Sequence, residues 1–200
     1  MLELSKSEGG YLPFTARLLA FLFLFSIAPS LAAQVRSGAE IQEMMLQASK
    51  DLAKLGSDPT IVESVRTHNA LKMGLAEVKR VDAAWANEAD TSPRVKRVLT
   101  SDIAKYLTKV APRNRGFVEV FLMGGVGELV AATARSSDYW QGDEPKWQRA
   151  FAGGKGATFV DRLRLDESSR AKIAQISVPV MDGGRAIGVL MFGIAVETYK

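Results

Sequence analysis

Cysteine is missing from this 200-residue sequence, and histidine occurs only once, at His68. Without cysteine the protein cannot form a disulfide, bind zinc through thiolates or use a thiol nucleophile. A single histidine makes a multi-histidine metal site or a histidine proton relay difficult to build. The sequence also lacks the Gly-x-Ser-x-Gly and Gly-x-x-x-x-Gly-Lys-Ser/Thr motifs of hydrolases and phosphate-binding loops. We therefore expect no catalysis, no metal and no cofactor, and His68 is expected to be packed or partly exposed within a helix.

Charge of one sign is not concentrated anywhere in the chain. The sequence has 26 Lys and Arg against 22 Asp and Glu, which gives a formal net charge of +4. Proteins that bind nucleic acids usually gather basic residues on one face. With 47% hydrophobic and 24% charged residues, the composition is typical of a folded domain. The sequence therefore predicts a folded protein without a nucleic-acid partner.

Long hydrophobic runs are also missing, and the longest early one is short. Residues 18–25 are apolar and are soon followed by Pro29 and by the small-residue pattern Ser30-Leu31-Ala32-Ala33. A membrane-spanning helix needs about 20 apolar residues, whereas this pattern is typical of a signal peptide cleaved after Ala32 or Ala33. We predict a signal peptide over residues 1–33, a single domain over 34–200 and a periplasmic location. An uncleaved N-terminal anchor is the alternative, and it also places the domain outside the cytoplasm.

The first half of the predicted domain has the spacing of amphipathic helices. Apolar residues recur every three or four positions over residues 41–55, 61–85 and 95–110. Asp58 followed by Pro59, and Ser92 followed by Pro93, are typical helix starts. The sequence therefore predicts three helices in this half.

The second half has the pattern of strands. Residues rich in β-formers and separated by glycine turns predict strands over 117–123, 128–134, 157–163, 171–181 and 186–196. The apolar run 187–196 is too short to cross a bilayer and indicates a buried strand. A short helix is expected over 146–152, with Asp143 as its N-cap. Helices followed by a mostly antiparallel sheet define an α+β domain.

One polar segment after the second expected strand concentrates three aromatic and three acidic side chains. The aromatic ones are Tyr139, Trp140 and Trp147. Aromatic rings beside carboxylates suit an amine or another cationic ligand. Arg135 and neighbouring basic residues would instead receive a carboxylate, so the charge of a ligand stays open. A structural interpretation is also open, in which Trp147 and Phe151 hold the short helix on the sheet.

These segments, taken in order, carry a resemblance to a known family. In the helical half the matching motifs are Asp58-Pro59-x-Ile61-Val62, Asn69-Ala70 and Asp82-x-x-Trp85. In the second half they are Thr133, Ser137-Asp138-Tyr139, Gln141-Gly142-Asp143-Glu144, Trp147, Asp161, Asp166-Glu167-Ser168 and Val178-Pro179-Val180. The chain resembles the Cache family, the PAS-like extracytoplasmic sensor domains (also called PDC sensors) of bacterial receptors. The resemblance covers roughly residues 41–196.

The resemblance implies long N-terminal helices packed on a five-stranded antiparallel PAS-like sheet. It also implies a small-ligand pocket on one face of the sheet, roofed by the segment after the second strand. The residues that the resemblance places at this pocket are Arg135, Tyr139, Trp140, Trp147 and Asp161. One departure is the turn Met123-Gly124-Gly125, where family members often have Asp-x-x-Gly. We expect this turn to lose its side-chain hydrogen bond.

Receptors of the family continue into a membrane helix and a signalling domain, whereas this sequence ends at Lys200. We therefore expect a free-standing periplasmic sensor that binds a small metabolite (an amine, an amino acid or an organic acid). It would relay ligand occupancy to a membrane receptor or kinase, and a homodimer through the N-terminal helix is a further expectation. The alternative is an interaction module whose pocket is filled by Trp140 and Trp147. A cavity lined by polar groups favours the sensor, and a packed one favours the interaction module.

Overall fold

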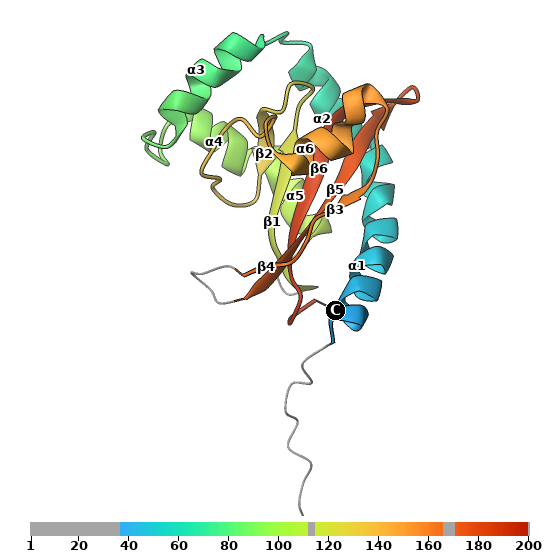
Figure 1. The fold of residues 1–200 in the computed structure, drawn as a ribbon. Coiled ribbons are helices and arrows are strands. Elements are labelled where there is room, and N and C mark those ends of the chain that lie inside the picture. Colours follow the sequence, from blue (N-terminus) through green and yellow to red (C-terminus); the bar gives the residue numbers. More distant parts are fainter. Residues whose placement is uncertain (1–36, 112–114, 166–170, 200) are drawn as a thin grey trace, which may run out of the picture. The chain divides into compact units, whose positions relative to one another are not determined.

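An antiparallel sheet forms the centre of the computed structural model, which describes residues 37–111, 115–165 and 171–199 (Figure 1). The strands are β1 (Phe117–Met123), β2 (Leu129–Ala132), β3 (Phe159–Val160), β4 (Arg164–Leu165), β5 (Lys172–Asp182) and β6 (Arg185–Ala195). Their order is β2-β1-β6-β5-β3, and β4 pairs with β5 beyond β3 along the same edge. Because β3 and β4 pair with β5 one after the other along the same edge, the sheet is five strands wide. The predicted α+β class with a five-stranded antiparallel sheet is confirmed.

The helices begin largely where the sequence predicts. They are α1 (Gly38–Ala53), α2 (Pro59–Asn69), α3 (Leu75–Trp85), α4 (Pro93–Thr100), α5 (Asp102–Val110) and α6 (Pro145–Phe151), with 3-10 turns η1 (Lys54–Ser57) and η3 (Ala152–Gly154). Asp58 accepts hydrogen bonds from the N–H groups of Thr60 and Ile61, and Ser92 accepts one from Val95. Such side-chain acceptors satisfy N–H groups that have no partner inside the helix. The starts predicted at Asp58 and Ser92 are therefore confirmed.

The single helix predicted over residues 61–85 is wrong, because the chain breaks between α2 and α3. Lys72 has a positive φ of 53°, and Gly74 precedes α3 in an extended conformation. Val65 of α2 and Val78 of α3 belong to two different hydrophobic clusters. Both helices bury apolar residues at helical spacing, so periodicity continues across the break and does not reveal it.

Three further boundaries differ from the predictions. The helix expected over 95–110 is divided at Ser101, which is extended and whose side chain accepts a hydrogen bond from Ala104 N–H at the start of α5. Asp143 is not the N-cap of the short helix: Glu144 has that position, and its side chain makes no capping hydrogen bond. The strand expected over 157–163 narrows to β3, because the chain leaves the edge of the sheet after Val160. The predicted signal peptide and the motif Asp166-Glu167-Ser168 lie outside the described residues.

The sheet carries a hydrophobic cluster on each face. Along β1, Val120 and Leu122 belong to the first cluster, whereas Phe121 and Met123 belong to the second. This alternation follows from the two-residue period of a strand. Helices α1, α2 and α5 cover the first cluster, and α3, α4 and α6 cover the second; Figure 1 shows α1 along one side of the sheet and α6 across it.

The central strands are buried on both faces, which explains their nearly continuous apolar sequence. Every residue of β6 from Gly188 to Ala195 is buried, so the buried strand predicted over 187–196 is confirmed. Met45 and Leu52 of α1 also point into the core.

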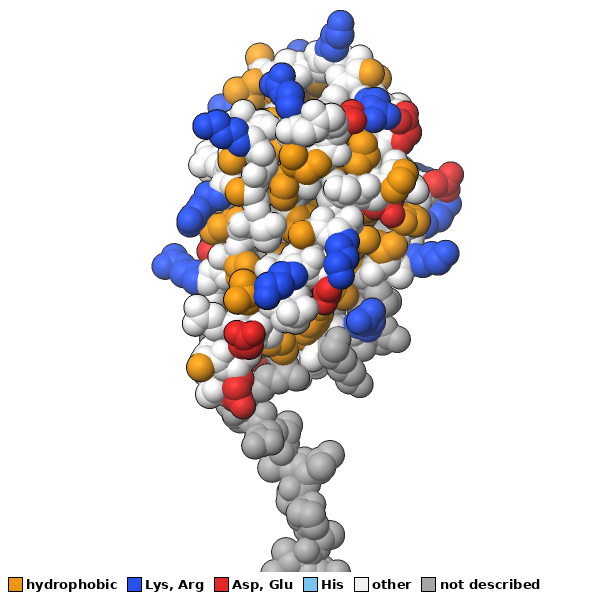
Figure 2. All heavy atoms as spheres, turned by 90° about the vertical axis from the view of Figure 1, so that its right-hand side faces the viewer, with side chains coloured by type: hydrophobic (Ala, Val, Ile, Leu, Met, Phe, Trp, Pro, Cys, Tyr) orange, Lys and Arg blue, Asp and Glu red, His pale blue; other side chains and the backbone are white. Residues whose placement is uncertain are grey.

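Figure 2 shows the right-hand side of the view in Figure 1, where hydrophobic side chains lie in patches between Lys and Arg. Within the described ranges, no helix combines the length and apolarity that a membrane span requires.

Candidate functional site

Helix α3 holds the segment between β2 and α6 through two side chains. One carboxylate oxygen of Asp82 accepts hydrogen bonds from the backbone N–H groups of Tyr139 and Trp140, at 2.8 and 2.9 Å. The indole N–H of Trp85 donates to the carbonyl of Ser136 at 2.8 Å. Residues three apart lie on one face of a helix, so Asp82 and Trp85 reach the same segment. The Asp82-x-x-Trp85 motif therefore positions the loop that the sequence singled out.

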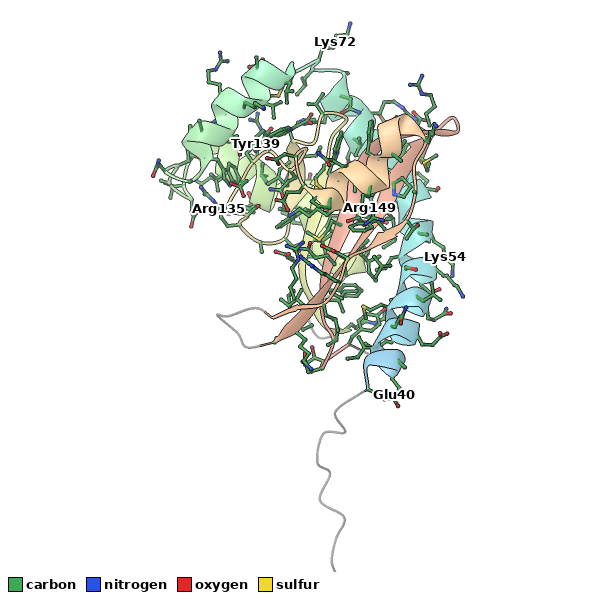
Figure 3. All side chains as sticks on the ribbon, viewed as in Figure 1. Glu40, Lys54, Lys72, Arg135, Tyr139 and Arg149 are labelled. Atoms are coloured by element: carbon green, nitrogen blue, oxygen red, sulfur yellow. The ribbon has the colours of Figure 1, made fainter. Side chains whose placement is uncertain are left out.

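Arg135 and Tyr139 both contact the ring of Trp85 at the end of α3. Figure 3 labels Arg135 and Tyr139 on the side of the molecule where α3 and α4 lie. The Arg135 guanidinium lies 4.3 Å from the centre of the Trp85 ring, and the Tyr139 ring centre lies 5.5 Å from it. Arg135 also donates to the carboxylate of Asp90 at 2.8 Å and to the carbonyls of Trp85 and Glu88. A cation that binds the last carbonyls of a helix stabilises its C-terminus. The donors of Arg135 are therefore used inside the chain.

Trp140 and Trp147 both hold the turn between β1 and β2. The indole N–H of Trp140 donates to the carbonyl of Val126 at 2.8 Å, and that of Trp147 donates to the carbonyl of Gly124 at 3.1 Å. Trp147 stacks on Phe151 with ring centres 4.6 Å apart, and both pack against the second hydrophobic cluster. This agrees with the interpretation that they hold α6 on the sheet. The sheet face beneath the loop is thus occupied by aromatic side chains.

The same turn receives side-chain hydrogen bonds from its last residue, Glu128, and from Asn69 of α2. Glu128 is 3% exposed, and its carboxylate accepts from Val126 N–H at 3.2 Å while lying 3.0 Å from His68 Nε2. A Cβ at Gly124 would lie 2.5 Å from Glu128 Oε1, so glycine there leaves room for the carboxylate. Asn69 accepts from Gly125 N–H at 3.1 Å. Glu128 and Asn69 thus supply side-chain hydrogen bonds to this turn, in which the Asp-x-x-Gly pattern is missing.

A cavity of about 220 Å³ lies against β2, between the end of α2, α3 and α4. Its polar lining comes from His68, Glu77, Arg94, Arg97 and Tyr139. Tyr139 is 5% exposed, and within the described part of the chain its hydroxyl has no hydrogen-bond partner. Burial, together with the negative charge of Glu128, raises the pKa of Tyr139 to about 12. The phenol is therefore protonated at neutral pH and is available to donate a hydrogen bond.

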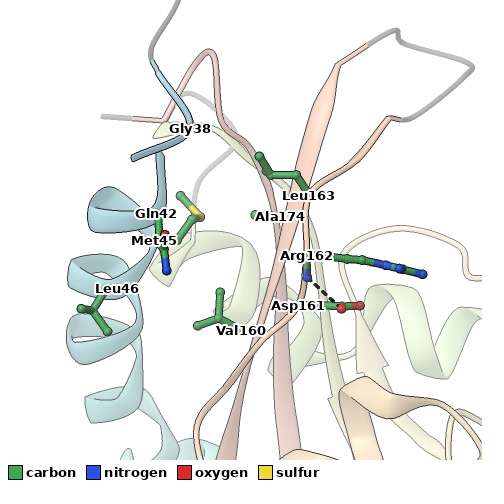
Figure 4. A pocket seen from close by; sticks show the side chains of 9 residues that line it. All are labelled: Gly38, Gln42, Met45, Leu46, Val160, Asp161, Arg162, Leu163 and Ala174. Carbon is green, nitrogen blue, oxygen red and sulfur yellow. Dashed lines mark hydrogen bonds between the residues drawn. The ribbon is translucent and has the colours of Figure 1, made fainter. Parts of the chain in front are cut away.

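Asp161 lies elsewhere in the fold. It follows β3 at the opposite edge of the sheet from β2, beside a groove of about 480 Å³ between α1 and this edge. Its carboxylate accepts from the backbone N–H of Arg162 at 2.8 Å and from the guanidinium of Arg164 at 2.7 Å. In Figure 4 the Val160 side chain is directed toward α1, whereas the Asp161 carboxylate is directed away from it. Asp161 therefore does not join the cavity beside Tyr139.

The structure brings the predicted site residues together in pairs. Arg135 and Tyr139 meet at Trp85, Trp140 and Trp147 meet at the β1–β2 turn, and Asp161 lies apart. Sequence reasoning missed Arg94, Arg97 and Glu128. The two arginines are three residues apart in α4, at the spacing that places two charges on one helix face. This spacing is the sequence signal that could have identified them. Among the described residues, no group of three or more acidic or histidine side chains is placed to hold a metal ion.

Comparison with known proteins finds likeness only among solved structures. No family model matches the sequence, and no curated protein matches it. One similar structure is the ligand-binding domain of the Pseudomonas aeruginosa PAO1 amino acid chemoreceptor PctC in complex with GABA (18% identity, 76% of this chain and 62% of that one, TM-score 0.36). Others are the sensory domain of the Campylobacter jejuni chemoreceptor Tlp3 (17%, 78% and 63%, 0.35) and the sensor domain of the V. cholerae histidine kinase DctB (15%, 79% and 57%, 0.37).

These matched structures are sensor and ligand-binding domains of the Cache type, the class that the sequence motifs resemble. The chain spans between 57% and 63% of their lengths. At identities below 20% and TM-scores below 0.5, this likeness carries no information about the ligand or the partner of this chain.

Proposed function

We propose that this protein is a free-standing periplasmic sensor domain that binds a small metabolite, without catalysis, and relays its occupancy to a membrane receptor or kinase. The observation that carries the proposal is the cavity beside Tyr139. It combines polar side chains from α2, α3 and α4 with a buried tyrosine whose hydroxyl has no partner in the described part of the chain. Sites for small molecules are concave and contain a few placed polar groups in an apolar lining. This cavity has that character.

The elements around the cavity supply a path for a signal. Tyr139 belongs to the loop that Asp82 of α3 holds, and His68 at the end of α2 lines the same cavity. Helix α2 is separated from α1 only by η1 and Asp58. A ligand that makes the loop more rigid against α2 and β2 therefore also affects α1, which is joined to α2 through η1 and Asp58. We propose that α1 transmits this change to the membrane partner. We also propose that α1 forms the contact of a homodimer.

A thermal-shift screen of the purified protein against amines, amino acids and organic acids tests the sensor proposal. A ligand at 100 times its dissociation constant stabilises the fold by about 2.7 kcal/mol, which corresponds to several degrees for a domain of this size. We expect at least one hit that Tyr139→Phe weakens. Tyr106→Phe is the matched control, because the Tyr106 hydroxyl donates to Asp58 and does not line the cavity. A panel without any hit, or hits that Tyr139→Phe leaves unchanged, would contradict the proposal.

The alternative, an interaction module with a PAS-like fold, has its own supporting observation. Trp140 and Trp147 are tied to the β1–β2 turn and fill space beneath the loop. In addition, Leu46 and Leu163 are 49% and 40% exposed beside the groove between α1 and the β3 edge. This alternative predicts no stabilisation by metabolites. It is favoured only if the screen is silent while the protein forms a complex of defined stoichiometry with a purified partner.

A further inference from the structure

The turn between α2 and α3 leaves two leucines at the surface. Leu71 is 66% exposed and Leu75 is 45% exposed, whereas Met73 between them is partly buried against the second hydrophobic cluster. Met73 therefore holds the turn on the fold, while the leucines on either side of it remain in solvent. Single exposed leucines are common on protein surfaces, but these two share one short turn.

Lys72 lies at the point of this turn. Its φ is 53°, in the left-handed region that glycine usually occupies after a helix. The residue is exposed, and Figure 3 shows its side chain directed away from the rest of the molecule. Because glycine would adopt this backbone with less strain, neither packing nor turn geometry accounts for a lysine here. The charge of Lys72 is presented to the surroundings of the protein.

Helix α3 adds positive charge next to Leu75. Lys79 and Arg80 are exposed, and Lys79 follows Leu75 by about one helical turn. The only acidic residue in the sequence from 71 to 80 is Glu77, whose carboxylate lies 3.5 Å from the guanidinium of Arg80. This segment therefore carries a net charge of +2 beside the two leucines. We call residues 71–75, together with Lys79 and Arg80, the α2–α3 tip.

The kind of partner follows from the charge and from the size of the α2–α3 tip. Exposed apolar side chains surrounded by basic ones are typical of segments that bind the surface of anionic membranes. Long Lys and Arg side chains reach lipid phosphates while neighbouring apolar groups enter the boundary of the acyl chains. A standard protein interface takes about 20–30 residues from each partner, and a protruding turn with one helix face supplies far fewer. Charge and size thus favour a lipid surface over a protein.

We infer that the α2–α3 tip binds the surface of a membrane that contains anionic phospholipids. Leu71 and Leu75 enter the interfacial layer, and Lys72, Lys79 and Arg80 contact lipid phosphates. This inference goes beyond the proposed sensor function and does not depend on which metabolite binds. The contact keeps the protein at the surface in which a membrane receptor or kinase lies.

A fluorophore at the tip gives a local test. The chain has no cysteine, so one introduced cysteine takes a single label. Gly74→Cys is suitable, because Gly74 has a φ of −78° and a Cβ there would meet no atom within 4 Å. The purified protein, labelled with the polarity-sensitive dye nitrobenzoxadiazole, is titrated with vesicles of phosphatidylcholine alone or mixed with an equal part of phosphatidylglycerol.

We expect the emission of the dye at Gly74→Cys to rise and shift to the blue with the anionic vesicles. Each basic residue near an anionic surface strengthens binding about fivefold, so binding is expected to be at least about tenfold tighter than to phosphatidylcholine alone and to weaken with added salt. The matched label is Gly38→Cys, which also has no atom within 4 Å of its Cβ and lies at the start of α1, away from the tip (Figure 1). We expect its emission to stay unchanged.

Variants of the Gly74→Cys protein identify the contacts. We expect Lys72→Gln and Leu75→Gln each to weaken vesicle binding about fivefold. Leu71 and Lys79 are left intact, because Leu71 also borders the cavity beside Tyr139 and the Lys79 ammonium lies 4.6 Å from the centre of the Trp140 ring.

The matched controls lie on the α1 side of the molecule. Leu46 is 49% exposed, close to the value for Leu75, and Lys54 is exposed like Lys72. Leu46→Gln and Lys54→Gln are expected to leave vesicle binding unchanged, and circular dichroism confirms that each variant is folded. Equal effects of the tip and control variants would overturn the inference.

Three further results would also overturn it. They are no response to anionic vesicles, a response at Gly38→Cys without one at Gly74→Cys, and equal binding to both kinds of vesicle. If vesicles do not bind while Leu75→Gln abolishes a complex with a purified protein, the tip is a protein contact and the inference is wrong. The metabolite screen does not use vesicles, so the sensor proposal stands or falls separately.

Discussion

Tyr139 combines two environments in one side chain. Its ring packs against Trp85 in the second hydrophobic cluster, and the residue also lines the cavity at β2. The sequence singled out Tyr139 because a large aromatic residue in a polar loop needs a packing partner or a ligand. It did not reveal that Arg97 would be its neighbour, since 42 positions along the chain separate the two. Residue chemistry is readable from the sequence, but the pairing of residues across the fold is not.

The alkaline stability of the protein tests the burial of Tyr139. A tyrosine whose pKa rises from 10.0 to about 12 on folding contributes stability that is fully present below pH 10 and is lost as the pH rises from 10 to 12. The reason is that the unfolded chain releases the phenol proton first. Between pH 8 and pH 11, we expect the wild type to lose about 1.4 kcal/mol more unfolding free energy than Tyr139→Phe. Urea denaturation across this range measures it, and parallel curves for the two proteins would contradict it.

At the scale of elements, the loop between β2 and α6 depends on α3 for its shape. Asp82 accepts from two consecutive backbone N–H groups of the loop, and Trp85 donates to a third position. The sequence contained this information as the motif Asp82-x-x-Trp85, without indicating what the two side chains bind. It also contained the periodicity of α2 and α3, but not the break between them. Local spacing defines which face of a helix is apolar, and the fold decides where that face is directed.

Replacement of Asp82 by alanine is expected to release the loop. It leaves two backbone N–H groups without their acceptor, and such a loss costs about 1–3 kcal/mol. Glu43→Ala is the matched control, because Glu43 is an exposed acidic residue of α1 and surface changes of this kind stay within about 0.5 kcal/mol. Urea denaturation gives the stability, and hydrogen exchange at the Tyr139 and Trp140 amides gives the local effect. Unchanged exchange at both amides in Asp82→Ala would contradict this role.

At the scale of the whole molecule, the strand order separates two surfaces. The cavity beside Tyr139 lies at the β2 edge, and the groove beside Asp161 lies at the β3 edge, with β1, β6 and β5 between them. Helix α1 packs over the first cluster and borders the groove. Because Met45 and Leu52 of α1 are core residues, the proposed homodimer through α1 would use its exposed side. The proposed ligand and partner surfaces are thus at opposite ends of the sheet.

The predicted export of the protein is tested on the whole chain. We expect cells that express it to release it in the periplasmic fraction with an N-terminus at Ala33 or Gln34, because the apolar run and small residues match a cleavable signal peptide. Fractionation followed by intact-mass measurement checks this. Ala32→Arg, which puts a large charged side chain where a small residue is needed, is expected to block cleavage after Ala32. Recovery of the uncleaved wild-type chain in the membrane fraction would support the anchor alternative instead.

The class of the fold and most of its elements follow from the sequence. Helical and strand periodicities, N-caps and glycine turns involve only a few neighbouring residues, so they can be recognised in the sequence without knowledge of the fold. Which of the predicted site residues lie close together depends on the three-dimensional packing of the chain. Strand β6 inserts between β1 and β5, and this long-range pairing separates Asp161 from the other four predicted site residues. Helix packing at the β2 edge brings Arg97 to Tyr139, because contacts between distant segments depend on the order of the strands and on the faces that the helices bury.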